Sequence, residues 1–240
     1  MPTPRKIGIL GGMGPEATVL LMQKIIDATP VQDDRDHIPM IVDNNPQIPS
    51  RIDALIHGTG ENPGPVLQRM ARDLEGAGAE ALIMPCNTAH HYAGFIEADI
   101  SVPFLNMISL TCEKLASELP AGSRIGLLAS PAVRLSRLFE TGLARVEMEP
   151  VYATDDDALL RIIRTVKAGG PTPEAVDGLN AVARELEVAG VAGILVACTE
   201  FSLLRKSIVA TVPVSDSLDV ITQAAVDFAL NSAPDQPPEA

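Results

Sequence analysis

Short apolar runs alternate with longer amphipathic stretches along most of the chain. The apolar runs predict buried strands at 6–10, 40–42, 81–84, 102–105, 124–128, 193–196 and 212–214. The amphipathic stretches predict helices from about residue 15, at 66–74, at 182–190 and at 216–230. Strands that are apolar throughout and alternate with helices are typical of parallel sheets covered on both faces. The pattern therefore predicts an α/β fold with mainly parallel sheets.

The second half of the chain repeats the first. The matching segments are 6–10 with 124–128, 70–78 with 182–190, Cys86-Asn-Thr with Cys198-Thr-Glu, and 102–103 with 212–213, at offsets of 118, 112, 112 and 110 residues. Ordered matches at nearly one offset predict two pseudo-symmetric α/β domains, at 1–108 and 109–215. We expect the helix at about 216–230 to pack back on the first domain and the Pro-rich tail at 233–240 to be disordered.

Composition excludes some classes of function. The 240 residues are 46% hydrophobic and 20% charged, which suffices for a buried core. The net charge of −13 repels phosphate backbones, and aromatic residues for base stacking make up only 3%, so we expect no nucleic-acid partner. We find neither a secretory leader nor an apolar run of the roughly 20 residues that span a membrane. A cytoplasmic protein with no membrane partner is therefore expected.

The repeat gives meaning to two of the three cysteines. Cys86 and Cys198 each follow a predicted buried strand and precede a predicted helix, whereas Cys112 lies on an apolar helix face and is interpreted as core. A single cysteine at such a place is more often a small buried hydrophobe. Ligands of open α/β sheets bind beyond the carboxyl ends of the strands, so two symmetric domains would place both thiols in one cleft. Backbone amides and a helix dipole there are expected to lower the thiol pKa.

Two thiols that face each other across a small ligand suit inversion of a carbon centre. One thiolate removes a proton from carbon, and the opposite thiol returns a proton to the other face. A disulfide redox pair is the rival interpretation, but such pairs usually lie close in sequence, and Cys86 and Cys198 are 112 residues apart.

Two further patterns point to different chemistry. The segment Gly12-Met-Gly-Pro-Glu-Ala17 fits the G-x-G-x-x-A pattern of dinucleotide-binding proteins, with Asp43 available as the ribose-binding acid. A tight turn whose amides meet any anion is the simpler interpretation. His90 and His91 are adjacent, so they point to different sides of a helix, and no Cys or Asp completes a metal site at useful spacing. We predict no metal and keep an NAD-dependent oxidoreductase as an alternative.

Four motifs together give the chain a family resemblance. They are Ile7-Gly-Ile-Leu-Gly-Gly-Met-Gly-Pro15, Asp43-Asn-Asn-Pro-Gln-Ile-Pro-Ser-Arg51, Met84-Pro-Cys-Asn-Thr-Ala-His90 and Cys198-Thr-Glu200. From Ile7 to about Leu230 the chain resembles the aspartate/glutamate racemase superfamily, and most closely its aspartate racemase and broad-specificity amino-acid racemase branch. The resemblance implies two α/β domains with a site between them, frequent homodimers, and two catalytic cysteines that match Cys86 and Cys198. It also implies independence from pyridoxal phosphate, and we expect no other cofactor.

The resemblance and the residue chemistry together predict a substrate site. It implies that Arg51 binds a substrate carboxylate, where the planar guanidinium can form two parallel hydrogen bonds, and that Lys167 binds substrate. By themselves these residues would be a surface charge and a helix C-terminal lysine. The other predicted binding residues are Met13, Gln47, Asn87, Thr88, Ser130, Thr199 and Glu200. Ser130-Pro-Ala-Val133 departs from the Thr-rich turn of the relatives, which bears on the side-chain pocket.

We therefore predict a cofactor-independent amino-acid racemase that inverts Cα by a two-thiol acid/base mechanism, with aspartate as the expected substrate. A broad-specificity racemase of neutral amino acids is the first alternative. A non-catalytic amino-acid-binding protein is an alternative of another class, and retention of both cysteines argues against it.

Overall fold

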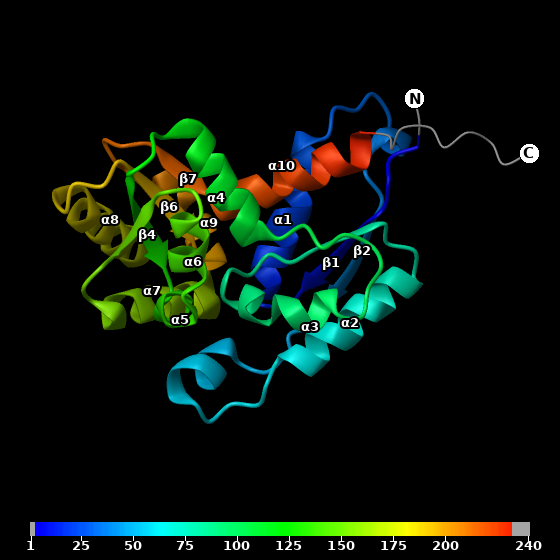
Figure 1. Ribbon diagram of the computed structural model, residues 1–240, viewed down its shortest axis with the longest axis horizontal. Coiled ribbons are helices and arrows are strands. Elements are labelled where there is room, and N and C mark those ends of the chain that lie inside the picture. The colour runs from blue at the N-terminus through cyan, green and yellow to red at the C-terminus, as the bar shows by residue number, and fades with distance from the viewer. Residues whose placement is uncertain (1–2, 232–240) are drawn as a thin grey trace, which may run out of the picture.

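The computed structural model describes residues 3–231 and contains two parallel β-sheets. The predicted tail at 233–240 lies outside the described residues. One sheet has the order β2-β1-β3 and the other the order β5-β4-β6-β7, and every strand pair is parallel. Figure 1 shows the two sheets in separate halves of an elongated molecule. The mixed α/β architecture with parallel sheets is confirmed.

The first sheet lies between two apolar layers. Its strands are β1 (Ile7–Gly11), β2 (Met40–Asn44) and β3 (Ala81–Ile83), and the helices that accompany it are α1 (Pro15–Ala28), α2 (Gly64–Gly76) and α3 (Ala93–Glu97). Alternate strand positions face opposite sides, so Ile7 and Ile9 join a core with α1, whereas Leu10 and Leu82 join a core with α2. Short helical turns η1 (Asp34–Asp36), η2 (Asp53–His57) and η3 (Thr88–Tyr92) lie in the connections.

The second sheet is built in the same way. Its strands are β4 (Arg124–Ala129), β5 (Glu149–Tyr152), β6 (Gly193–Ala197) and β7 (Val214–Asp216). The helices are α4 (Met107–Glu118), α5 (Pro131–Ser136), α6 (Leu138–Ala144), α7 (Asp156–Gly169), α8 (Pro173–Val188) and the one-turn α9 (Thr199–Ser202), followed by η4 (Arg205–Ser207). Helices α4 and α6 share a core with one face of the sheet, and α7 and α8 share a core with the other.

The C-terminal helix α10 (Ser217–Leu230) follows the last strand of the second sheet but packs against α1 and α4. Its buried residues Leu218, Ile221 and Ala225 join the core beneath β1 and β3. The amide of Arg5 near the other end of the chain donates to the carbonyl of Ala229. In Figure 1 this helix runs beside α4 and above the first sheet. Its first turn consequently lies where the two sheets approach each other.

Prolines change two of the predicted strands. The run at 102–105 forms one isolated parallel bridge, between Leu82 and Phe104, because Pro103 has no N–H for a ladder. The run at 212–214 contributes a strand only from Val214 onward, after Pro213. Edge strand β5 is short and contains Pro150, and its weak apolar pattern left it unpredicted. Among the described residues, no helix is long and apolar enough to cross a membrane.

The glycine turn after β1 is closed on itself. Gly12 has φ of +95°, and a Cβ there would lie 2.2 Å from the carbonyl oxygen of Asn45, so the turn requires glycine. Its amide donates to Oγ1 of Thr18 at 2.9 Å, and that hydroxyl in turn donates to the carbonyl of Gly14. The Gly12 amide is therefore already paired within the turn. The residue of this turn that lines the pocket is Met13.

Candidate active site

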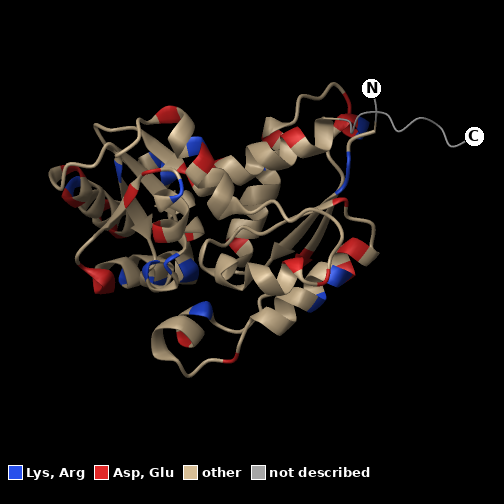
Figure 2. Ribbon diagram, viewed as in Figure 1, with Lys and Arg blue, Asp and Glu red and all other residues tan. Residues whose placement is uncertain are grey.

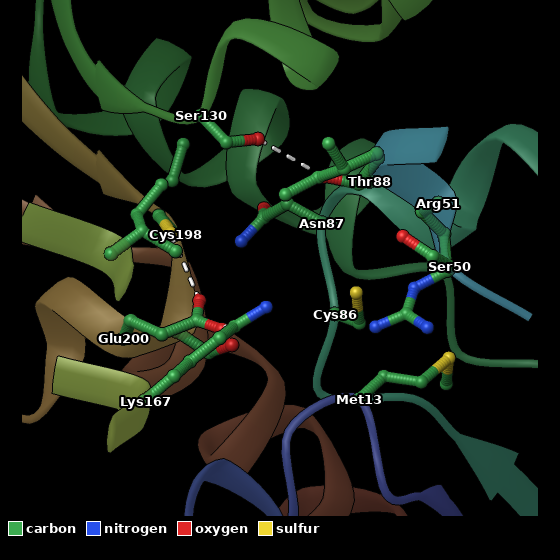
Figure 3. A pocket seen from close by; sticks show the side chains of 14 residues that line it. Met13, Ser50, Arg51, Cys86, Asn87, Thr88, Ser130, Lys167, Cys198 and Glu200 are labelled. Atoms are coloured by element: carbon green, nitrogen blue, oxygen red, sulfur yellow. Dashed lines mark hydrogen bonds and ion pairs between the residues drawn. The ribbon is translucent and has the colours of Figure 1, made fainter. Parts of the chain in front are cut away.

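The carboxyl ends of β1, β3, β4 and β6 open into one pocket that is lined from both halves of the molecule. Its lining residues are Met13, Ser50, Arg51, Ile52, Cys86, Asn87, Thr88, Ser130, Ile163, Lys167, Ala197, Cys198, Thr199 and Glu200. Figure 3 shows Cys86 with Arg51 and Met13 on one side, and Cys198 with Glu200 and Lys167 on the other. The structure therefore brings the two cysteines and nearly all predicted binding residues together.

Gln47 is the predicted binding residue that the structure does not bring into this lining. Its side chain is exposed, and its backbone amide donates to the side chain of Asn45 in the loop that leads to Arg51. Sequence reasoning missed four lining residues, Ser50, Ile52, Ile163 and Ala197. Ser50 and Ile52 flank Arg51, and Ile163 lies one helical turn before Lys167. Their spacing from the predicted residues could therefore have placed them in the pocket lining.

Cys198 is buried at the end of β6, directly before the one-turn helix α9. Its thiol donates to Oε2 of Glu200 at 3.0 Å. Burial raises the pKa of the Cys198 thiol well above its ordinary value, and the charge of Glu200 raises it further, while Lys167 opposes them. The expected lowering of the pKa by a helix dipole is wrong for this cysteine, because one turn of helix offsets neither burial nor an adjacent carboxylate.

Glu200 links this thiol to the lysine across the pocket wall. Its other oxygen, Oε1, lies 3.2 Å from Nζ of Lys167 on α7. The Glu200 side chain is 12% exposed and that of Lys167 is 41% exposed, so the ion pair is partly desolvated. One oxygen of the Glu200 carboxylate therefore accepts from the thiol, and the other pairs with the lysine cation.

Cys86 is held through its backbone. It follows β3, its amide donates to the carbonyl of Met84, and its own carbonyl lies 2.8 Å from Nδ1 of His90. The amide of Met107 donates to Nε2 of the same ring at 3.1 Å, so Nε2 is the acceptor and Nδ1 carries the proton. His90 is thus a neutral link between the Cys86 loop and the start of α4, and both of its ring nitrogens are used.

This arrangement predicts a pH-dependent contribution of His90 to stability. Complete burial lowers the pKa of His90 to about 4 from the ordinary 6.5. Between pH 4 and pH 6.5, His90 is protonated in the unfolded chain but neutral in the folded chain. The contribution of His90 to the free energy of unfolding is therefore lost as the pH falls from 6.5 toward 4. The destabilisation caused by His90→Asn should therefore be smaller at pH 4.5 than at pH 7 by about 2–3 kcal/mol, measured by urea unfolding. Equal destabilisation at the two pH values would contradict this assignment.

Polar residues after the strands join the two halves at the pocket. The hydroxyls of Thr88 and Ser130 lie 3.3 Å apart, which connects the end of β3 to the end of β4. Thr199 is buried beside Cys198, and Asn87 is buried beside Cys86. Each cysteine is therefore followed by a buried polar residue that lines the pocket.

Arg51 reaches the pocket from a loop of the first half. Its Nη1 donates to the carbonyl of Pro49 at 3.1 Å, and its buried Nε has no hydrogen-bond partner among the described residues. The turn η2 that follows Arg51 contacts α5 of the other half, so this loop spans the cleft mouth. An arginine held in this way has donors left for an anion.

The remaining candidates fall outside the pocket. Cys112 packs in the core beside α6, and burial raises the pKa of its thiol to about 12, which confirms its interpretation as core. No group of three or more His, Cys, Asp or Glu within residues 3–231 could hold a metal ion. Figure 2 shows acidic residues spread over helices of both halves. The charged residues that line the pocket are two cations, Arg51 and Lys167, and one carboxylate, Glu200, so the negative charge of the chain is not concentrated there.

Comparison with known proteins agrees with this site. The model of the Asp/Glu/hydantoin racemase family matches residues 10–225. The broad-specificity amino-acid racemase RacX of Bacillus subtilis (strain 168) is 26% identical over 228 residues, which cover 92% of this chain and 96% of that protein. The structure of Picrophilus torridus aspartate racemase superposes with a TM-score of 0.82 at 30% identity and 94% coverage of both chains.

A putative Asp/Glu racemase from Yersinia pestis superposes with a TM-score of 0.75 at 25% identity, over 95% of this chain and 100% of that one. The family match includes strands of both sheets and both cysteine segments. The chain is therefore a racemase, an isomerase that belongs to the Asp/Glu/hydantoin racemase family.

Proposed function

We propose that this protein is a pyridoxal-phosphate-independent amino-acid racemase that inverts Cα of aspartate with Cys86 and Cys198 as opposed acid and base. The observation that carries the proposal is that two buried thiols, at the ends of equivalent strands, line one pocket together with two cationic side chains. The homodimer that the family resemblance implies and the cytoplasmic location expected from the sequence are part of the proposal.

Each turnover moves two protons. The thiolate of one cysteine takes the Cα proton, so an S–H bond forms while the Cα–H electron pair moves toward the substrate carboxylate. The thiol of the other cysteine then gives its proton to the opposite face of Cα and becomes the thiolate. In the ligand-free pocket Cys198 is the neutral thiol, because its proton lies on the hydrogen bond to Glu200 and burial raises the pKa of this thiol. The reverse reaction exchanges the two roles.

The cations of the pocket supply what this proton transfer needs most. A Cα–H is weakly acidic, and the charge that develops in the transition state falls on the carboxylate oxygens. Arg51, whose buried Nε has no partner among the described residues, lies on the Cys86 side, and Lys167 lies on the Cys198 side. Aspartate carries two carboxylates, so each cation can bind one of them. Asn87, Thr88 and Thr199 also line the pocket, and we assign them to binding the α-carboxylate and the α-ammonium group.

One observation favours the alternative of a neutral amino-acid substrate. Lys167 already forms an ion pair with Glu200, so a single cation, Arg51, is left for a single carboxylate. Neutral amino acids have only that one carboxylate, and the relative RacX is described as a broad-specificity racemase.

A panel of substrates tests the proposed activity. The purified protein is incubated with each L-amino acid in heavy water without pyridoxal phosphate, and chirality and Cα deuterium are followed. We expect D-aspartate to accumulate fastest. Faster turnover of neutral amino acids would favour the broad-specificity racemase over an aspartate racemase. The absence of Cα exchange with every amino acid would contradict racemisation.

Glu200→Gln tests the link between the carboxylate and Cys198. The amide keeps the shape of the side chain but removes the charge that raises the pKa of the Cys198 thiol. We expect kcat/KM to fall about 10- to 100-fold and the limb of the pH–rate profile that belongs to Cys198 to move to lower pH. Glu174→Gln, in the exposed first turn of α8, is the control and should change neither quantity. An unshifted pH–rate profile in Glu200→Gln would remove Glu200 from the proposal.

A further inference from the structure

Ser202, four residues after Cys198, ties the segment of this cysteine to the start of α10. Its amide donates to the carbonyl of Cys198 at 3.1 Å. Its hydroxyl donates to Oδ1 of Asp216 at 2.9 Å. The same oxygen accepts from the amide of Leu218 at 2.8 Å, so Asp216 caps the helix. Ser202 and Asp216 are both buried, so solvent does not compete for the bond between them.

The first half contains an equivalent contact behind Cys86. His90, four residues after Cys86, holds the carbonyl of this cysteine and accepts from the amide of Met107 at the start of α4. Ser202 lies 112 residues after His90, which is also the offset between the two cysteines. Helices α4 and α10 pack side by side (Figure 1). Each cysteine segment is therefore anchored to the start of the helix that follows it, by a ring in one half and by a hydroxyl and a carboxylate in the other.

The carboxylate of Asp216 is more than a helix cap requires. Asn106, which lies 110 residues earlier, caps α4 with a neutral side chain whose Oδ1 accepts from the amides of Ile108 and Ser109. Asp216 instead shares its Oδ1 between one amide and the hydroxyl of Ser202. Burial raises the pKa of Asp216 to about 6, so the group is ionised at neutral pH, and a charged acceptor strengthens the bond from Ser202. A buried carboxylate is costly, and the neutral cap of α4 shows that a cap alone does not need one.

We propose that Ser202 is a positioning residue, anchored by Asp216, that holds the Cys198 thiol where proton transfer to and from Cα requires it. The proposal rests on the function proposed above and extends it to two residues outside the pocket lining. The side chain of a cysteine follows its backbone, and a displacement of about 1 Å at a reacting group can lower a rate by about 100-fold. A thiol that serves in turn as base and as acid on one face of Cα is sensitive to such a displacement.

Alkylation of the ligand-free protein by iodoacetamide reports on each thiol separately. The rates at Cys86, Cys112 and Cys198 are measured by mass spectrometry of their peptides, for the wild type and for Ser202→Ala. The variant removes the bond between α9 and Asp216, so the buried thiol at the start of α9 becomes accessible to solvent and reagent. We expect alkylation of Cys198 to be about tenfold faster in Ser202→Ala, and that of Cys86 to stay within about twofold of the wild type.

Two controls distinguish this effect from a general loosening of the fold. Cys112 is buried in the core that α4 and α6 share with the second sheet, so its alkylation should stay slow in every variant. Thr222→Val removes another buried hydroxyl, which donates to the carbonyl of Leu218 within α10, and it should leave all three rates within about twofold. Acceleration of Cys198 and Cys112 together, or an unchanged rate at Cys198 in Ser202→Ala, would overturn the proposal.

Asp216→Asn tests the anchor. The amide keeps an oxygen that can accept from Ser202 and from the amide of Leu218, but it loses the charge that strengthens the bond. The alkylation rate of Cys198 should therefore lie between those of the wild type and Ser202→Ala. A faster rate in Asp216→Asn than in Ser202→Ala would contradict the anchoring by this hydrogen bond.

Cα exchange in single-thiol variants tests the consequence for the reaction. Cys86→Ser leaves only Cys198 as a base, and Cys198→Ser leaves only Cys86. The addition of Ser202→Ala should lower the exchange rate about tenfold more in Cys86→Ser than in Cys198→Ser. An equal loss in the two variants would show a merely structural role and overturn the proposal. If the wild type exchanges the Cα proton of no amino acid, the proposed function fails, whereas the alkylation rates still decide whether Ser202 positions Cys198.

Discussion

Cys86→Ser and Cys198→Ser should each reduce racemisation of the substrate at least about 10³-fold. A serine hydroxyl keeps the shape of the thiol but is a far weaker acid. At neutral pH it neither ionises to act as the base nor donates its proton to Cα. Because one thiol remains in each variant, exchange of the Cα proton of one enantiomer should survive, and the favoured enantiomer should be opposite in the two variants. Chiral chromatography together with NMR of Cα deuterium measures both quantities.

Cys112→Ser is the control for this pair. Cys112 is buried among Ile108, Leu115 and Phe139, so its replacement should lower the free energy of unfolding but leave kcat/KM within about twofold. Racemisation that persists in both Cys86→Ser and Cys198→Ser would exclude the two-thiol mechanism, even if the activity itself were confirmed.

Arg51→Met should lower kcat/KM about 10²- to 10³-fold. The change removes a guanidinium that lines the pocket, and with it the charge that stabilises the carboxylate as the Cα proton leaves. Arg51→Lys should recover only part of the loss, because an ammonium group cannot form two parallel hydrogen bonds to a carboxylate. Steady-state kinetics with aspartate and with a neutral amino acid measure the effect.

Arg161→Met is the matched control, since Arg161 lies on α7 with Lys167, is well exposed and does not line the pocket. It should leave kcat/KM within about twofold. Activity of Arg51→Met equal to that of the wild type would show that the substrate carboxylate binds elsewhere in the pocket.

The sequence repeat predicted the central feature of the site with no knowledge of its geometry. Each cysteine lies at the carboxyl edge of its own parallel sheet, and the two edges open into one pocket between the halves. The buried strands were predictable for a related reason, since β1, β4 and β6 are apolar at nearly every position. Strand β5 was not predicted, because Pro150 and a half-buried edge weaken its pattern, and the run predicted as a strand at 102–105 forms only the bridge at Phe104.

The surroundings of each thiol could not be predicted from the pattern. Glu200 and Lys167 meet because α7 lies beside α9, a matter of packing between segments that are distant in sequence. The same packing buries Cys198 and reverses the expected direction of its pKa.

The isotopic composition of the first product tests the two-thiol mechanism most directly. L-aspartate that carries protium at Cα is incubated with the wild-type protein in heavy water, and both enantiomers are recovered while conversion is still low. With two opposed thiols, the proton taken from one face stays on the first cysteine while the second delivers a deuteron from solvent. We predict D-aspartate that is fully deuterated at Cα beside remaining L-aspartate that is still almost entirely protium. D-aspartate that retains the original protium would show a single base acting on both faces and would contradict this mechanism.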